Sequence, residues 1–230
     1  MIEKAAPNAA KCPFARSPAY VSSKKRANSL WRTYSTQTEI FVSHVTPRFA
    51  SAEPMVSAIP KFDTRSRPTD QMRSTPPIQR KVWFDMHADD LNDRDYWSCL
   101  ATLWVTDYLA HDRGWWHVRL WCGRPHRSAA MKPAERAIYE QLNEPIILHR
   151  GYATSASTIG ISWTDDQAVA EFFAYDFLCH QPGYAPGMGG IVSCAFDPKE
   201  IAFFKNENGE REFLVSEPAA LAHITDQMSA

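Results

Sequence analysis

No stretch of this 230-residue sequence approaches the roughly 18 to 20 uninterrupted apolar residues that a membrane-spanning helix requires. The first residues are not followed by the apolar segment of a secretory signal. A formal net charge of -1 gives no overall attraction to nucleic acid or to an anionic membrane. We therefore expect a cytoplasmic protein that has no membrane partner.

Paired cysteines are also missing. The five cysteines are odd in number and include no Cys-x-x-Cys pair, which argues against a disulfide framework and against a tetrahedral zinc site. We expect no metal centre and a reducing compartment. Cys179 and His180 are adjacent in sequence, but nucleophilic catalysis requires neighbours in space, so a catalytic thiol is not predicted.

Positive charge is concentrated in the first third of the chain. Residues 1–80 hold 13 Lys and Arg against 5 Asp and Glu, whereas residues 81–230 hold 12 against 21. The first segment is rich in Ser, Thr, Pro and Arg and shows no sustained helix or strand period. We predict a largely disordered basic extension, which fits a flexible addition, a start codon assigned too far upstream, a transit peptide or a polyanion-binding arm. Nucleic acid is expected as a partner only through this extension.

The segment 81–144 is predicted to be helical. Apolar and aromatic residues recur at three- and four-residue steps from Asp95 to His111, which is the period of an amphipathic helix. Another helix is predicted to begin at Pro133, whose fixed φ suits a first helical turn, and to end before Pro145. We interpret the aromatic faces of this segment as core.

The segment 145–216 is predicted to be rich in strands. A helix is expected from Thr164, whose spacing to Gln167 is that of a capping box, and a Gly- and Pro-rich loop covers 181–190. The predicted strands are Ile146–Arg150, Ile159–Trp163, Ile191–Phe196, Ile201–Phe204 and Glu210–Val215. Helices followed by strands, rather than alternating with them, indicate an α+β fold. No Rossmann or P-loop glycine fingerprint follows any of these strands, so a nucleotide would need another device.

Three short motifs stand at the ends of these strands: Leu148-His149-Arg150-Gly151-Tyr152, Ser162-Trp163-Thr164 and Glu210-Arg211-Glu212. Together they resemble the ADP-ribosyltransferase superfamily, in the branch marked by an Arg, a Ser/Thr-x-Ser/Thr step and a Glu-x-Glu pair in this order. The segment is similar to small uncharacterised prophage-type members. The resemblance implies an ADP-ribosyltransferase-like split β-sandwich over 81–230 that uses NAD as a substrate.

The resemblance also implies roles for individual residues. Glu212 is the expected catalytic carboxylate, which would bind the ribose hydroxyl and stabilise the oxocarbenium ion that forms when nicotinamide leaves. Glu210 would orient or deprotonate the incoming nucleophile, since positions i and i+2 of a strand share a face. Arg150 would hold the NAD pyrophosphate or ribose with its planar fork of donors. Ser162 would bind the ribose or hold Glu212, and Thr164 would serve the helix cap more than the ligand.

Other residues near Arg150 are less directly implicated. Gly151 and Tyr152 complete the motif at the expected cofactor site, and Tyr152 shares the face of Arg150. His149 lies on the opposite face from Arg150 in a regular strand, so we interpret it as structural. Trp163 departs from the superfamily pattern, in which a small hydroxyl residue often stands at this position.

The function expected from these motifs is NAD-dependent mono-ADP-ribosyl transfer to a protein or other acceptor. Two alternatives stay open. A non-catalytic binding module of a phage or mobile element could keep the same fold, and an NAD glycohydrolase could use the same residues with water as the acceptor. The acceptor itself is undefined by the sequence.

Overall fold

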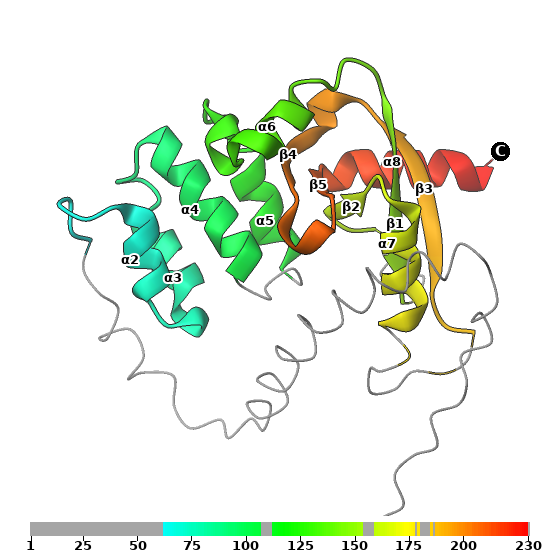
Figure 1. The fold of residues 1–230 in the computed structure, drawn as a ribbon, viewed down its shortest axis with the longest axis horizontal. Coiled ribbons are helices and arrows are strands. Elements are labelled where there is room, and N and C mark those ends of the chain that lie inside the picture. Colours follow the sequence, from blue (N-terminus) through cyan, green and yellow to red (C-terminus); the bar gives the residue numbers. More distant parts are fainter. Residues whose placement is uncertain are drawn as a thin grey trace, which may run out of the picture.

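The architecture is taken from a computed structural model that describes residues 62–106, 112–153, 159–177, 179, 185 and 187–229. Residues 1–61 of the predicted basic extension lie outside the described residues, as do residues 181–184 and 186 of the predicted loop 181–190. Helices come first in the chain and strands follow (Figure 1). The predicted α+β class is therefore confirmed.

The N-terminal part is a set of helices that begins earlier than predicted. Its α-helices are α2 (Pro68–Ser74), α3 (Pro77–His87), α4 (Asp93–Thr106), α5 (Arg113–Leu120) and α6 (Pro133–Tyr139). A proline occupies the first helical position of α2, α3 and α6, where its missing N–H leaves no intrahelical bond unmade. The prediction that disorder extends to residue 80 is wrong for the described residues after Lys61, because α2 and the start of α3 lie there.

The strands form one antiparallel sheet with the order β3-β1-β2-β5-β4. They are β1 (Ile146–Tyr152), β2 (Ser162–Thr164), β3 (Gly190–Phe196), β4 (Ile201–Lys205) and β5 (Glu212–Val215). Between β2 and β3 the chain forms α7 (Gln167–Glu171), which continues as one π-helical turn (Phe172–Asp176). After β5 it ends in α8 (Glu217–Ser229). The strand predicted for 210–215 thus begins two residues later than expected.

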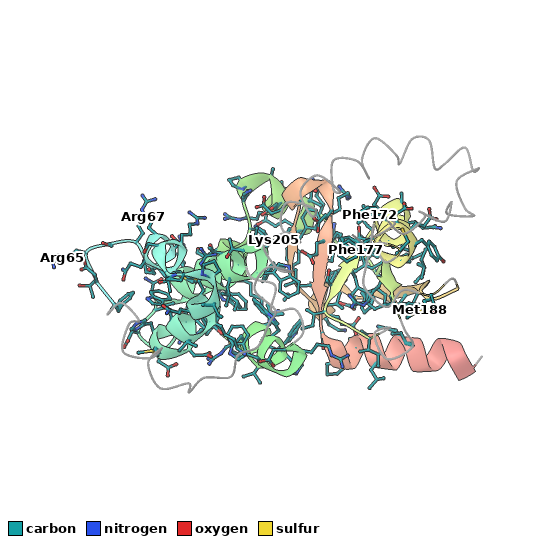
Figure 2. The ribbon with its side chains drawn as sticks, turned by 90° about the horizontal axis from the view of Figure 1, so that it is seen from below. Arg65, Arg67, Phe172, Phe177, Met188 and Lys205 are labelled. Carbon is teal, nitrogen blue, oxygen red and sulfur yellow. The ribbon has the colours of Figure 1, made fainter. Side chains whose placement is uncertain are left out.

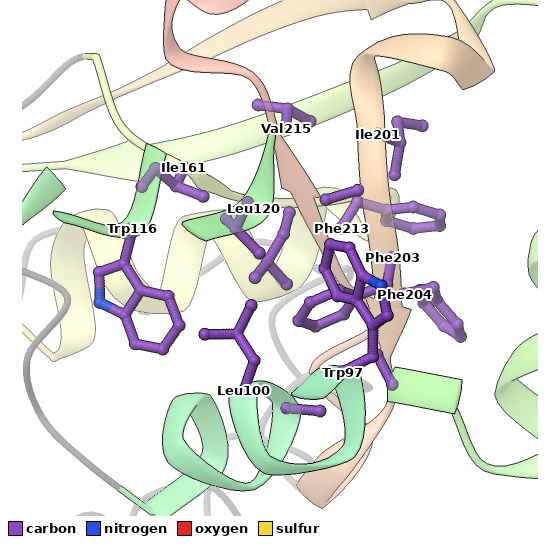
Figure 3. Packing of buried hydrophobic residues seen from close by; sticks show 14 of the residues in the cluster. Trp97, Leu100, Trp116, Leu120, Ile161, Ile201, Phe203, Phe204, Phe213 and Val215 are labelled. Atoms are coloured by element: carbon purple, nitrogen blue, oxygen red, sulfur yellow. The ribbon is translucent and has the colours of Figure 1, made fainter. Parts of the chain in front are cut away.

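The main core joins the helical half to the sheet. Trp97 and Leu100 of α4 and Trp116 of α5 belong to one buried cluster with Phe203 and Phe213 of the sheet, and all five are fully buried (Figure 3). Burying an aromatic or large aliphatic side chain stabilises a fold by about 1.5–3 kcal/mol. The helices and the strands are therefore one folding unit. Within the described parts of the chain, no helix is long and apolar enough to cross a membrane.

A second apolar layer lies under α7. Val169 and Phe172 are buried, and Phe172 contacts the rings of Phe173 and Phe177 at centroid distances of 5.3 and 6.3 Å. Figure 2 shows Phe172 and Phe177 beside α7, on the far side of the molecule from α2. These aromatic residues pack with one another.

Candidate functional site

A row of polar residues crosses all five strands of the sheet. Ser193 of β3 lies opposite His149 of β1, which lies opposite Thr164 of β2. Thr164 in turn lies opposite Glu212 of β5, and Glu212 lies opposite Lys205 of β4. Directly opposed residues of antiparallel strands present their side chains on the same face. The sheet register therefore places Glu212 between a hydroxyl residue and a lysine.

Glu212 accepts a hydrogen bond on each carboxylate oxygen. The Ser162 hydroxyl donates to Oε1, and the indole Nε1 of Trp104 donates to Oε2 over 2.7 Å. Ser162 reaches Glu212 diagonally across the β2–β5 pair, because Ser162 and Thr164 share a face of β2. Trp104 comes from α4, so the position of this carboxylate depends on the packing of the helices against the sheet.

The environment of Glu212 acts on its pKa in two directions. Burial of the carboxyl raises the pKa above the usual value for a glutamate, and this effect prevails. The hydrogen bonds from Ser162 and Trp104, and the charges of Arg150 and Lys205, act to lower the pKa. A carboxyl group whose pKa is perturbed by desolvation and by specific hydrogen-bond donors is typical of functional sites.

Arg150 approaches this carboxylate from the other face of the sheet. Its Nη1 donates to the backbone carbonyl of Ser162 over 2.7 Å. The guanidinium packs on Gly160 and occupies the space that a side chain there would take, since an added Cβ would lie 2.8 Å from Nε. Burial lowers the pKa of Arg150 to about 10, although the charge of Glu212 acts to raise it. Arg150 is thus charged at neutral pH and close enough to Glu212 for the two charges to interact.

The position of His149 relative to Arg150 agrees with the sequence interpretation. His149 does lie on the opposite face of β1 from Arg150, but Glu212 lies on the His149 face. The ring nitrogen Nδ1 of His149 is 2.7 Å from the hydroxyl of Ser193. This histidine therefore belongs to the same polar row as the carboxylate, and its contact with Ser193 agrees with the structural role expected for it.

Gly151 and Tyr152 take part in close packing at the end of β1. A Cβ on Gly151 would lie 2.7 Å from the backbone nitrogen of Ala174, so β1 and the π-helical turn approach as closely as a glycine permits. The ring of Tyr152 lies over Gly190 of β3, where an added Cβ would be 2.5 Å from the hydroxyl oxygen. Local packing therefore accounts for the glycine at 151 and for the contact of Tyr152 with Gly190.

Thr164 supports the backbone around Glu212. Its hydroxyl donates to the carbonyl of Glu210 over 2.9 Å and accepts from the backbone N–H of Asp166 over 3.1 Å. The predicted capping box does not form, because Asp166 is the N-cap of α7 and accepts from the Ala168 N–H. The preference for a structural role of Thr164 agrees with these bonds.

Glu210 is not placed as predicted. It has helical dihedrals, with φ of -73° and ψ of -19°, and the next residue, Arg211, has a positive φ of 49°. The strand begins only at Glu212, so the alternation that was to bring both carboxylates to one face does not apply. Arg211 is fixed by Asp165, whose Oδ1 accepts from Nε over 2.6 Å.

Two residues near Glu212 were not identified from the sequence. Trp104 was assigned to the core by its helical spacing, and nothing local indicates that its indole N–H faces a carboxylate. Lys205 is nearly fully buried and forms an ion pair with Glu135 over 2.9 Å. A lysine at the end of an apolar strand is visible in the sequence. That Lys205 lies opposite Glu212 depends on the sheet register, which the sequence does not show.

A pocket of about 220 Å³ lies between α2, α4 and the end of β4, and Lys205 is one of the residues that line it. Arg150, Ser162 and Glu212 are not among the residues that line it. Figure 2 shows Lys205 in the middle of the molecule, between the helical half and the strands. The carboxylate site and the pocket are thus separate features.

Comparison of the chain with protein-family models, with curated proteins and with solved structures finds no match.

Proposed function

We propose that this protein is an NAD-dependent mono-ADP-ribosyltransferase. The observation that carries the proposal is the doubly hydrogen-bonded, desolvated carboxylate of Glu212, held by Ser162 on the neighbouring strand and near the charge of Arg150. These are the residues of the three motifs, and the strands that carry them, β1, β2 and β5, are neighbours in the sheet. The split β-sandwich that the resemblance implies stays a part of this proposal, whereas the described strands form one antiparallel sheet.

The proposed reaction begins with cleavage of the bond between C1′ of the ribose and the nicotinamide nitrogen. Nicotinamide leaves with the bonding electron pair, and the positive charge that remains is shared between C1′ and the ring oxygen. The Glu212 carboxylate would stabilise this charge, because its two donors fix its orientation before the reaction begins. Arg150 would bind the anionic pyrophosphate of NAD through guanidinium N–H groups.

The second half of the reaction needs a nucleophile at C1′. The acceptor forms a bond to C1′ and loses a proton, and we propose Glu210 as the group that orients it or takes the proton. The main-chain carbonyl of Glu210 is tied to Thr164, which fixes its backbone beside the start of β5. Water in place of a macromolecular acceptor would make the same site an NAD glycohydrolase.

The decisive experiment is to incubate the purified full chain with NAD and to follow free nicotinamide by chromatography. Glu212→Gln keeps the shape of the side chain but removes the charge, so we expect nicotinamide release to fall at least about 100-fold, the usual effect of losing one electrostatic contact at a reacting centre. Glu144→Gln, at an exposed glutamate outside the site, is the matched control and should release nicotinamide at the wild-type rate. Equal release by both variants would refute the assignment of Glu212.

A non-catalytic binding module is the second candidate, and one observation favours it. Both oxygens of Glu212 already accept hydrogen bonds from the protein, and the pocket of about 220 Å³ lies elsewhere. If the folded wild-type chain releases no nicotinamide, this candidate replaces the transferase. If the chain releases nicotinamide together with free ADP-ribose, and no component of a cell lysate becomes labelled from labelled NAD, the NAD glycohydrolase replaces the transferase.

A further inference from the structure

The pocket beside α4 is lined by residues other than Arg150, Ser162 and Glu212 of the proposed NAD site. Its volume of about 220 Å³ is below the roughly 300–1,000 Å³ of pockets that enclose drug-sized ligands. A dinucleotide is too large for it, whereas a monosaccharide phosphate is of suitable size. The polar residues that decide its chemistry are Arg73, Ser98, Thr102, Lys132, Lys205 and Glu207.

Two of the three cations in the pocket wall are neutralised by carboxylates of the protein. Lys205 pairs with Glu135 over 2.9 Å, and both side chains are less than a tenth exposed. Lys132 pairs with Glu207 over 2.6 Å at the rim. These pairs leave the pocket close to neutral before the third cation is considered.

Arg73 is the cation that supplies the excess charge. Its ion pair with Asp70 is long, at 3.8 Å, and both side chains are more than 60% exposed, so the pair holds the guanidinium weakly. The pKa of Lys132 is raised by its hydrogen bond to Glu207, but the nearby charge of Arg73 acts to lower it. Lys132 is already paired with Glu207, so the weakly held guanidinium of Arg73 is the group at this rim that would attract an anion.

The wall formed by α4 offers hydrogen-bond acceptors. The hydroxyl of Ser98 donates to the carbonyl of Ala129 over 3.1 Å, and that of Thr102 donates to the carbonyl of Ser98 over 2.8 Å. The hydroxyl of Thr106 donates to the carbonyl of Thr102 over 2.8 Å. Each hydroxyl group has one hydrogen to donate, so the oxygen lone pairs of these residues are what a ligand would meet.

We propose that this pocket binds a small phosphorylated sugar or polyol. The phosphate lies between Arg73 and Lys132, and the hydroxyl groups of the ligand donate to the hydroxyl oxygens of Ser98 and Thr102. The guanidinium fork suits a phosphate because it can donate two parallel hydrogen bonds. The proposal is independent of NAD cleavage, so an inactive Glu212→Gln chain is expected to bind the ligand as the wild type does.

The first test is isothermal titration calorimetry of the full chain with ribose 5-phosphate, inorganic phosphate and ribose as probes. Ribose 5-phosphate is expected to bind more tightly than either fragment. Arg73→Gln is expected to raise its Kd about 10-fold or more, because a charge-assisted hydrogen bond to phosphate is lost. Arg65→Gln is the matched control, since the side chain of Arg65 is 91% exposed and lies outside the pocket. This variant should bind ribose 5-phosphate with the Kd of the wild type.

A second variant tests the wall that faces the sugar. Thr102→Val keeps the shape of the side chain but removes the hydroxyl oxygen. We expect it to raise the Kd for ribose 5-phosphate several-fold and to leave the Kd for inorganic phosphate unchanged. If Arg73→Gln fails to fold, Lys132→Gln tests the phosphate position instead, and it should raise the Kd for ribose 5-phosphate.

Three results would each overturn the proposal. One is a Kd for ribose 5-phosphate that is the same in Arg73→Gln and Arg65→Gln. Another is the absence of binding heat with the folded wild-type chain at millimolar ligand. The third is tighter binding of the cation agmatine than of ribose 5-phosphate, because that would make Glu207 rather than Arg73 the residue that selects the ligand.

Discussion

The fold acts on the ionised form of Glu212 in two ways: hydrogen bonds stabilise it, and burial destabilises it. Ser162 and Trp104 each donate to one of its oxygens, but removal from water has the larger effect and raises its pKa. Folding therefore favours the protonated form of this carboxyl relative to the unfolded chain. The contribution of Glu212 to stability is fully present below the ordinary glutamate pKa and is lost as the pH rises through the raised pKa.

The first prediction follows from that sign. Glu212→Gln removes the titration, so the variant should gain stability relative to the wild type as the pH rises above about 4.5, up to a plateau above the raised pKa. The carboxamide can be accommodated because the Ser162 hydroxyl is able to accept a hydrogen bond from its nitrogen. Urea unfolding of both chains from pH 4 to pH 8 measures the difference. A difference that is constant across this range would contradict the raised pKa.

Glu210 and Arg211 show what a sequence pattern leaves out at the scale of single residues. Alternation along a strand predicted that Glu210 and Glu212 share a face, but Arg211 has a φ of 49° and the strand begins after it. Glycine and asparagine are the residues that indicate a left-handed conformation, and position 211 holds neither. An ion pair with Asp165, 46 positions earlier, holds Arg211 there. Contacts between distant parts of the chain are not visible in local spacing.

At the scale of elements, the start of α6 at Pro133 was predicted correctly, whereas the strand predicted from Ile159 begins only at Ser162. The predicted strands from Ile146 and Ile191 each match an observed strand within two residues, because alternation and turn residues are local signals. Helix α2 lies in a segment whose composition indicates disorder, and its one buried residue, Met72, packs against other helices. Tertiary packing therefore decides whether such a short helix forms.

The contact between β1 and the π-helical turn gives the second prediction. Gly151→Ala would place a Cβ 2.7 Å from the backbone nitrogen of Ala174, so one of the two elements must move. We expect a loss of about 1–3 kcal/mol in the free energy of unfolding, which is the usual cost of overpacking. Chemical denaturation followed by circular dichroism measures this loss.

Gly114→Ala is the matched control for that substitution. Gly114 lies in α5, and an added Cβ there has no atom of the described residues within 4 Å. Alanine in a helix is favoured over glycine by up to about 1 kcal/mol, so this variant should be as stable as the wild type or more stable. If both variants lost the same free energy, the close approach at Gly151 would not be the cause.

At the scale of the whole molecule, the helical half and the sheet stabilise each other. Trp104 of α4 positions Glu212 of β5, and Glu135 of α6 neutralises the buried Lys205 of β4. Leaving a buried charge without its partner typically costs about 3–5 kcal/mol. The composition of the sequence placed a boundary at Lys81, yet α2 and α3 belong to the same packed unit as the strands.

The last prediction concerns this boundary. A fragment of residues 81–230 lacks α2 and the first turn of α3, and so loses the fully buried Met72 and the nearly fully buried Thr75. Trp83 would also lose the ring of Phe62, whose centroid lies 6.2 Å from its own. We expect this fragment to be less stable than a fragment of residues 62–230 by about 2–3 kcal/mol, the value of burying one large apolar side chain.

Urea unfolding of the two fragments, followed by tryptophan fluorescence, measures this difference. The shorter fragment should also have the smaller dependence of stability on urea, because it exposes less surface on unfolding. Equal midpoints and equal slopes would mean that α2 adds nothing to the core and that folding begins at Lys81. A lower midpoint would identify Phe62 as the better starting residue for nicotinamide-release assays on a fragment, because Trp104 can orient Glu212 only while α4 keeps its packing against α2 and α3.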